Sequence, residues 1–483
     1  MNAKKGMGIA MNKINEPMDP KKSIFQIIYI FLGLFVLVMG YFTYFMIFRS
    51  GDVINSTYNK RQEVLSERVI RGEIRSADGD ILAKSVTGAE GSETREYPYG
   101  DMFAHAVGRY SKGITGVEES ENIRLLTSNI NTFEKMYHDL IGEKSLGNNV
   151  VTTLNTELQQ IAYDALGDHR GAVVVMEPDT GKILAMVSKP SYDPNKVDEQ
   201  WTALLEDEGT ESPLLNRATQ WPYPPGSTFK VMTALEYMRE NPTYRSYDYN
   251  CDGSIDYNDM VIHCYNNKAH GEVDLTLSFA KSCNTSFASI GKTLDLDSFY
   301  KLCESFLFNR NLPITLTNSP SSFTLQKADS SVKEAMQTAI GQGKTLMTPL
   351  HNALIAATVA NGGVMMKPYV VDHVENAYGN LVKKYSPQIN SKPMTVREAN
   401  FLAKMMREVV KNGTATKLKD LKVEVAGKTG SADQEGKKAH SWFIGYAPYD
   451  NPKIVVSIIV ENVGTGSDYA VPIAKKIINA YFK

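Results

Sequence analysis

The sequence has few cysteines and no surplus of charge of either sign. Four cysteines among 483 residues are too few for a disulfide scaffold. The 52 basic and 54 acidic side chains give a net charge of -2, without the basic excess that nucleic-acid-binding proteins usually show. We find no internal repeat and no low-complexity tract. With 42% hydrophobic residues, a chain of this length can bury one large core and a smaller module, which predicts two folded domains.

One long apolar run, residues 24–48, stands apart from this globular composition. As a helix it exceeds the roughly 30 Å hydrocarbon core of a bilayer, and this length disfavours the alternative of a buried core helix. It is longer than the core of a signal peptide, about 7–15 residues, and no small-x-small cleavage site follows, so we expect an uncleaved membrane anchor. Five lysines precede the run and three basic residues follow it closely. The positive-inside rule therefore favours, weakly, a cytoplasmic N-terminus with residues 1–23 as a polar tail.

A small module is predicted between the anchor and a glycine-asparagine break near residue 148. Residues 62–74, the turn Asp78-Gly79 and the apolar residues 81–83 suggest strand, turn and strand. No residues in this module have a catalytic spacing. We therefore expect a β-rich pedestal over residues 49–149.

The second predicted domain, residues 150–483, has strands at both of its sequence ends. A helix over 156–166 precedes a hairpin formed by 172–176 and 182–187. The middle is mostly helical, and strands at 423–426, 442–447 and 454–460 precede a final helix over 471–481. Short turns imply antiparallel pairing. We predict an α+β domain in which one antiparallel sheet, completed by both sequence ends, carries helices on its faces.

The stretch 223–230 predicts the start of a helix that carries a serine and a lysine on one face. Pro224 and Pro225 disfavour helix before Gly226, and apolar residues then recur at helical spacing up to residue 240. Ser227 and Lys230 are three residues apart and therefore neighbours on this helix. The pattern alone is common, because Ser-x-x-Lys also starts at residues 278, 289, 298 and 330.

Two further patterns distinguish Ser227 from the other matches. Ser227-Thr-Phe-Lys230, Ser282-Cys-Asn284 and Lys428-Thr-Gly430 occur in the order that is typical of penicillin-binding proteins and serine β-lactamases. The surrounding sequence resembles the class B penicillin-binding proteins, of the penicillin-binding protein A-like type, across nearly its whole length. The segments that carry this resemblance are 71–74, 78–83, 171–175, 190–195, 215–217, 341–343, 348–350 and 426–431.

Each residue type in the three patterns suits acyl transfer. A serine hydroxyl is a weak nucleophile until a base removes its proton. Lys230 is the preferred base and must be neutral to act, and a charge on Lys428 would lower its pKa. Ser282 can relay a proton from Ser227 to Lys428 or to the leaving amine. Asn284 can hydrogen-bond a peptide amide.

The resemblance adds binding roles to these residues. It implies that Lys428 and Thr429 hold the substrate carboxylate and that Gly430 lets substrate lie alongside the strand. It also implies an oxyanion hole formed by the backbone N–H groups of Ser227 and Ser431, which can contribute about 3–4 kcal/mol.

The function implied is that of a membrane-anchored peptidoglycan D,D-transpeptidase. Such an enzyme crosslinks stem peptides through a serine acyl-enzyme, releases D-Ala, is acylated by β-lactams and uses no cofactor. The resemblance also implies an extracytoplasmic catalytic domain and a SEDS-type membrane glycosyltransferase as partner. A D,D-carboxypeptidase and a non-catalytic β-lactam or peptidoglycan sensor are the alternatives.

The remaining motifs favour no nucleotide or metal site. Neither Gly427-Lys-Thr nor Gly343-Lys-Thr has the preceding glycine of a phosphate-binding loop. The acidic residues 252, 256 and 259 lack the glycine and glutamate of a calcium loop. Cys251, His263, Cys264 and His270 match no standard zinc spacing, so a metal site is the least favoured alternative there, after unlinked thiols and a Cys251–Cys264 disulfide. Cys283 is interpreted as a packing residue.

Overall fold

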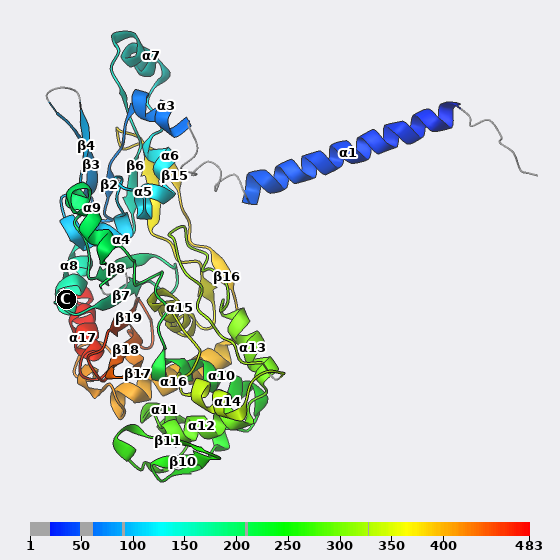
Figure 1. Cartoon of the computed structure of the whole chain (residues 1–483), viewed down its shortest axis with the longest axis vertical. Helices are drawn as coiled ribbons and strands as arrows, with labels where there is room; N and C mark the ends of the chain where they lie inside the picture. Colours follow the sequence, from blue (N-terminus) through cyan, green and yellow to red (C-terminus); the bar gives the residue numbers. More distant parts are fainter. Residues whose placement is uncertain (1–19, 49–60, 89–91, 208–210, 327) are drawn as a thin grey trace, which may run out of the picture. The chain divides into compact units, whose positions relative to one another are not determined.

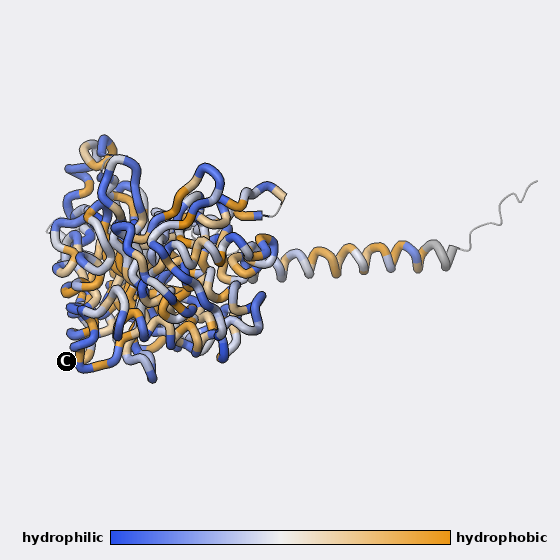
Figure 2. Tube along the Cα trace, turned by 90° about the horizontal axis from the view of Figure 1, so that it is seen from below, coloured by the Kyte–Doolittle hydropathy of each residue, from blue (hydrophilic) through white to orange (hydrophobic). Residues whose placement is uncertain are grey.

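The computed structural model describes residues 20–48, 61–88, 92–207, 211–326 and 328–483. The first 61 residues and residues 62–483 form two separate units. In the first, helix α1 (Pro20–Phe48) contains the apolar segment Ile24–Met46, which is long enough to cross a membrane. Its exposed hydrophobic residues recur along its length (Figure 2). The predicted anchor is therefore a continuous helix, whereas most of the predicted tail lies outside the described residues.

The N-terminal part of the second unit combines short strands with helices. Helix α3 (Arg61–Arg68) covers residues 62–68 of the predicted strand, so this part of the prediction was wrong. The turn at Asp78-Gly79 is confirmed, because it joins β2 to β3. The remaining elements are β1 (Val69–Ile70), β2 (Ile74–Arg75), β3 (Ile81–Thr87), β4 (Glu93–Glu96), α4 (Ala104–Val107), α5 (Gly116–Ser120), α6 (Asn122–Leu125), α7 (Thr132–Ile141), β5 (Ser145–Leu146) and β6 (Asn149–Thr152).

A six-stranded sheet in this region draws strands from far along the chain. Its order is β15-β14-β6-β2-β3-β4, where β14 (Val371–Glu375) and β15 (Leu381–Lys384) come from beyond residue 370. Glu118 lies buried beside this sheet and bridges Arg71 and Arg95. The predicted division at residue 149 therefore falls at the start of β6, in the middle of one hydrogen-bonded sheet.

A second sheet, called the large sheet because its strands are longer, has five antiparallel strands in the order β17-β18-β19-β7-β8. Its strands are β7 (Gly171–Met176), β8 (Ile183–Lys189), β17 (Ala426–Gln434), β18 (Lys437–Ala447) and β19 (Ile454–Val460). Both sequence ends of the domain therefore complete one sheet, as the sequence predicts. Helices α8 (Thr156–Leu166) and α17 (Ala470–Tyr481) lie on one side, and the buried helix α15 (Pro349–Ala360) lies on the other (Figure 1).

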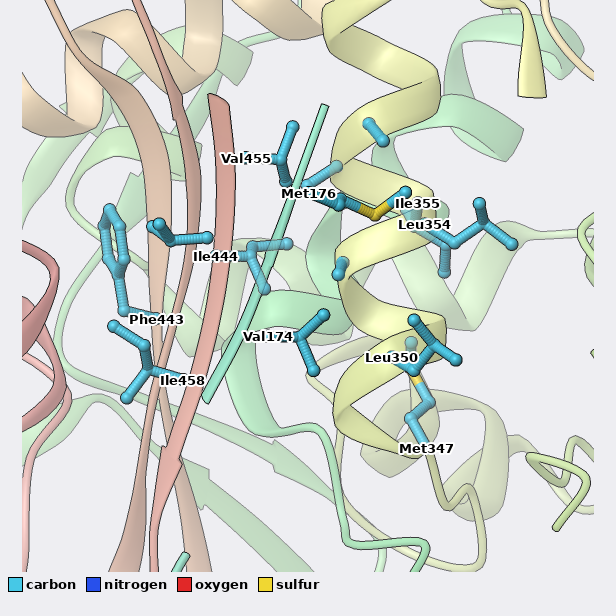
Figure 3. Packing of buried hydrophobic residues seen from close by; sticks show 14 of the residues in the cluster. Val174, Met176, Met347, Leu350, Leu354, Ile355, Phe443, Ile444, Val455 and Ile458 are labelled. Atoms are coloured by element: carbon cyan, nitrogen blue, oxygen red, sulfur yellow. The ribbon is translucent and has the colours of Figure 1, made fainter. Parts of the chain in front are cut away.

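Both faces of this sheet are apolar. Val174, Met176 and Val455 point toward Leu350 and Leu354 of α15, while Phe443 and Ile458 point to the opposite side (Figure 3). Strands buried on both faces read as continuous apolar runs, as in β19, where all seven residues are buried. This sheet is the rigid layer against which the other elements are positioned.

A mostly helical region with two small two-stranded sheets completes the fold. Strand β9 pairs with β12, and β10 pairs with β11. The elements of this region and its connections are α9 (Val197–Glu206), α10 (Lys230–Glu240), β9 (Tyr249–Cys251), β10 (Ser254–Tyr257), β11 (Met260–His263), β12 (Gly271–Val273), α11 (Leu275–Ala280), α12 (Asn284–Thr293), α13 (Leu296–Ser305), α14 (Val332–Ala339), β13 (Met365–Met366), β16 (Ile389–Ser391) and α16 (Val396–Lys411).

Candidate active site

Ser227 lies in a short 3-10 helix, Gly226–Phe229, that continues directly into α10. The sequence places Ser227 correctly in a first helical turn, although this turn is a 3-10 turn. Hydrogen bonds hold the turn on both sides. The indole N–H of Trp442 donates to the carbonyl of Pro224 at 3.0 Å, and the N–H of Gly226 donates to the carbonyl of Gly341 at 2.9 Å.

Two glycines bring this turn against β17, the edge strand of the large sheet. Gly226 has φ +54°, and a Cβ there would lie 2.6 Å from the carbonyl oxygen of Ser431. A Cβ on Gly430 would lie 3.0 Å from the carbonyl oxygen of Pro225. Side chains at these positions would separate the two segments. Their absence lets the backbones around Ser227 and Ser431 lie side by side.

The hydroxyl of Ser282 lies between two lysine ammonium groups. Lys428 Nζ donates to Ser282 Oγ at 2.9 Å, and Lys230 Nζ is 3.5 Å from the same oxygen. Lys230 also donates to the carbonyl of Ser282 at 2.9 Å and to Asn284 Oδ1 at 2.8 Å. The structure therefore brings together residues from three distant motifs, carried by α10, the start of α12 and β17.

Both lysines are fully buried, and burial favours their neutral forms. Desolvation lowers the pKa of Lys230 to about 8. It lowers the pKa of Lys428 well below its ordinary value, and the charge on Lys230 lowers that pKa further. The sequence analysis expected Lys428 to lower the pKa of Lys230. In the structure burial is the main cause at both lysines, and the repulsion between the two amines disfavours the state in which both are charged.

A cavity of about 700 Å³ opens over these groups. It is lined by most of the predicted site residues, namely Ser227, Ser282, Asn284, Thr429, Gly430 and Ser431. Lys230 and Lys428 are buried beneath it. The amide of Asn284 is engaged at both ends, because its Nδ2 donates to the carbonyl of His263 at 2.9 Å. The cavity is therefore lined by two serines from turns, Ser227 and Ser282, and by Thr429 and Ser431 from β17. The two buried lysine amines lie next to it.

The sequence analysis missed some residues of this cavity. Thr414 lines it, and its Oγ1 is 2.5 Å from Thr429 Oγ1. Residues 465–467 form another part of the wall, and the N–H of Gly466 donates to Ser431 Oγ at 3.3 Å. The pair Asn412-Gly413 before Thr414 signals only a turn, so no local pattern identifies these residues as part of a site.

Comparison with known proteins agrees with this geometry. Residues 171–479 match the penicillin binding protein transpeptidase domain, and residues 71–150 match the penicillin binding protein A dimerisation domain. The chain belongs to the penicillin-binding protein transpeptidase family. This penicillin-binding protein also has, among its described residues, a single N-terminal helix suited to anchor it in a membrane.

Several relatives of this penicillin-binding protein cover nearly all of it. It is 32% identical to the peptidoglycan D,D-transpeptidase PbpA of Mycolicibacterium smegmatis, over 92% of this chain and 96% of that protein. It is 33% identical to PbpA of Mycobacterium tuberculosis, over 93% of this chain and 96% of that protein. The solved imipenem acyl-enzyme of penicillin-binding protein A from M. tuberculosis superimposes with a TM-score of 0.79 at 31% identity, covering 87% of this chain and 100% of that one.

Proposed function

We propose that Ser227 is the acylated nucleophile of this peptidoglycan D,D-transpeptidase, which crosslinks stem peptides in cell-wall synthesis and is acylated by β-lactams. The observation that carries the assignment is the convergence on Ser282. The hydroxyl of Ser282 contacts Lys230 and Lys428, the lysines of the other two motifs, and Ser282 and Ser227 line the same cavity. The serines that start the other Ser-x-x-Lys patterns, at residues 278, 289, 298 and 330, form no hydrogen bond with a lysine among the described residues, and Ser278 is buried against Ser286.

In the first step, Ser227 Oγ attacks the carbonyl carbon of the penultimate D-Ala. Neutral Lys230 takes the hydroxyl proton, and Ser282 passes a proton to the departing amine, so that D-Ala leaves and an ester forms on Ser227. In the second step, an amine from a neighbouring stem peptide attacks this ester and restores the serine. The pKa of Lys230, lowered to about 8, keeps part of the enzyme in the required neutral form near neutral pH.

The oxyanion of each tetrahedral intermediate accepts hydrogen bonds from the N–H groups of Ser227 and Ser431. Ser227 begins a helical segment, where N–H groups have no partner within the helix. The close approach of Gly226 to the Ser431 carbonyl supports the pairing of these two N–H groups. Removing one such donor typically slows catalysis about 10²–10³-fold.

An extended donor peptide adds alongside β17, because this strand is the edge of the sheet. Gly430 leaves room for the peptide backbone, and Asn284 hydrogen-bonds a peptide amide. Thr429 and Thr414 present hydroxyls at the cavity wall for the terminal carboxylate. Lys428 supports this carboxylate site from behind, since it is buried and donates to Ser282 Oγ and to the carbonyl of Thr429.

Labelling with a fluorescent penicillin tests the nucleophile directly. We expect one adduct on the peptide that contains Ser227, identified by mass spectrometry, and none in Ser227→Ala. Ser289→Ala is the matched control, because Ser289 starts another Ser-x-x-Lys pattern on α12 and should label normally. An adduct on any other residue, or crosslinked product from Ser227→Ala, would contradict the assignment.

We further propose that residues 1–23 are cytoplasmic and that residues 49–149 and 150–483 are an extracytoplasmic pedestal and catalytic domain. The substrate supports this topology, because peptidoglycan is assembled outside the cytoplasmic membrane. A SEDS-type glycosyltransferase is the proposed partner. Protease digestion of intact protoplasts should remove the catalytic domain and spare the tail, and a SEDS protein should co-purify with the full chain. Protection of the catalytic domain would contradict the topology.

A further inference from the structure

Three cysteines and a histidine meet beside the catalytic residues. Cys251 ends β9, Cys264 follows β11, His270 precedes β12 and Cys283 precedes α12. Their three sulfurs and one imidazole nitrogen all lie within 4.8 Å of one another. The cysteines are buried and the histidine is half-buried. Four separate segments therefore place four soft ligand atoms around one point.

Three of the six distances among these atoms match those of a tetrahedral zinc site. Cys264 Sγ is 3.7 Å from Cys251 Sγ and 3.7 Å from Cys283 Sγ, while Cys251 Sγ is 3.4 Å from His270 Nδ1. With Zn–S bonds of about 2.3 Å and Zn–N bonds of about 2.0–2.1 Å, tetrahedral angles put two sulfurs about 3.8 Å apart and a sulfur and nitrogen about 3.5 Å apart. A disulfide would need about 2.05 Å, and all four cysteines are free.

We propose that Cys251, Cys264, His270 and Cys283 bind one zinc ion in a closed tetrahedral site. Three thiolates and a neutral imidazole fill its coordination sphere, so the ion has no open position and is structural. The thiols lose their protons as the ion binds. Thr285 Oγ1, which donates to Cys251 Sγ at 3.1 Å, supports a thiolate there. The set of soft sulfur ligands with one imidazole favours zinc over magnesium, calcium or manganese.

Metal binding would fix the two catalytic residues that flank Cys283. Ser282 has φ +57°, a left-handed conformation that is unfavourable for a residue with a side chain. A zinc–sulfur bond at the next residue holds this turn in place. On the other side, Asn284 receives a hydrogen bond from Lys230 and donates to His263, the neighbour of Cys264. Zinc therefore positions the Ser282-Cys-Asn284 motif. The consequence for catalysis rests on the proposed function, which assigns Ser282 and Asn284 their roles.

The sequence suggested a different set of residues as the candidate zinc ligands. That set joins His263 to Cys251, Cys264 and His270, with Cys283 as a packing residue. In the structure Cys283 replaces His263, whose side chain is exposed. The three buried sulfurs form a small cluster with Tyr249, separate from the main core. The cluster thus joins residues 249–273 to the start of α12, in addition to the contact that Ile262 makes with the main core.

Metal analysis of the purified full chain tests the site independently of catalysis. Protein isolated in detergent with a reductant should contain about one tightly bound zinc per chain that survives dialysis. Cys264→Ser should lose it, and Cys303→Ser, which removes a buried cysteine outside the cluster, should keep it. X-ray absorption at the zinc edge should show three sulfurs and one nitrogen. Metal-free wild-type protein, or a Cys251–Cys264 disulfide in protein taken from cells, would overturn the proposal.

A second measurement keeps the test valid if Cys264→Ser does not fold. Zinc is removed from the wild-type chain with a strong chelator and restored by adding ZnCl₂, and penicillin acylation and the melting temperature are followed throughout. We expect acylation to slow about 10–100-fold and to recover with zinc, since comparable losses follow when metal-site geometry is disturbed. Loss and return of zinc with unchanged acylation would overturn the positioning role. A failure of Ser227 labelling in the zinc-loaded chain would instead contradict the proposed function.

Discussion

Gly341 is predicted to control the position of the nucleophile although it has no reactive side chain. It has φ +83°, and a Cβ at this position would lie 1.7 Å from the carbonyl oxygen of Gly226 and 2.4 Å from its carbonyl carbon. Gly226 directly precedes Ser227. Because both obstructing atoms belong to the backbone, a rotamer change cannot relieve the contact. The Gly341→Ala substitution must therefore displace the turn that carries the nucleophile.

The required displacement can be read from these distances. An ordinary van der Waals contact begins near 3.4 Å, so the Gly226 carbonyl must move by more than an ångström. A misplacement of about 1 Å at a reacting group can cost roughly 10²-fold in rate. The same shift threatens the 2.9 Å hydrogen bond between the Gly226 N–H and the Gly341 carbonyl. We expect Gly341→Ala to slow acylation at least about 10²-fold.

Gly343 provides a matched control two residues away. Its φ is +82°, so alanine meets the same backbone strain, roughly 1–2 kcal/mol. The nearest atom to its Cβ would be 3.6 Å away, which is ordinary contact. We expect Gly343→Ala to lose some stability and to acylate at nearly the wild-type rate. Stopped-flow acylation with a fluorescent penicillin, well below the melting temperature of both variants, separates the two effects. Equal acylation rates would refute the reasoning.

Two further predictions concern buried charges. Glu118→Gln leaves Arg71 and Arg95 unpaired and should cost about 3–5 kcal/mol in chemical denaturation at neutral pH. Burial alone would raise the pKa of Glu118, but the two arginines bring this pKa below its ordinary value. The ionised carboxylate therefore stabilises the folded protein fully above pH about 4.3, and this contribution is lost as the pH falls further. At Lys230, whose pKa burial lowers to about 8, the acylation rate should rise with pH through that value. A pH-independent rate would contradict its role as the base.

The sequence predicts elements best where one property dominates a segment. The hairpin β7–β8, helix α8 and helix α17 match their predictions within two residues, because apolar periodicity defines them. Residues 62–68 mix charged and apolar side chains, and they form a helix where a strand was predicted. The pairing of β14 with β6 has no local signal, since more than two hundred residues separate the strands. Such pairings depend on tertiary packing.

The strand that carries Lys428 shows why functional segments are harder to predict. Apolar residues 423–426 suggest a strand that ends before the motif, yet β17 begins at Ala426 and continues to Gln434. Lys428 and Thr429 break the apolar pattern because they serve the site. Their strand conformation depends instead on pairing with β18, where Lys428 lies opposite Ile444 and Thr429 opposite Phe443. The motif gives the chemistry of these residues, and the neighbouring strand gives their conformation.

The tripeptide Ser282-Cys-Asn284 combines two roles that a sequence motif cannot separate. The catalytic pattern Ser-x-Asn leaves its middle position free, so a cysteine there carries no signal of its own. Its sulfur becomes informative only when the fold brings Cys251, Cys264 and His270 to the same point. Since Ser282 and Asn284 are adjacent to that sulfur in the chain, any ion bound there restrains both residues that contact Lys230. Metal occupancy and acylation are therefore expected to change together, although the ion contacts neither the substrate nor Ser227.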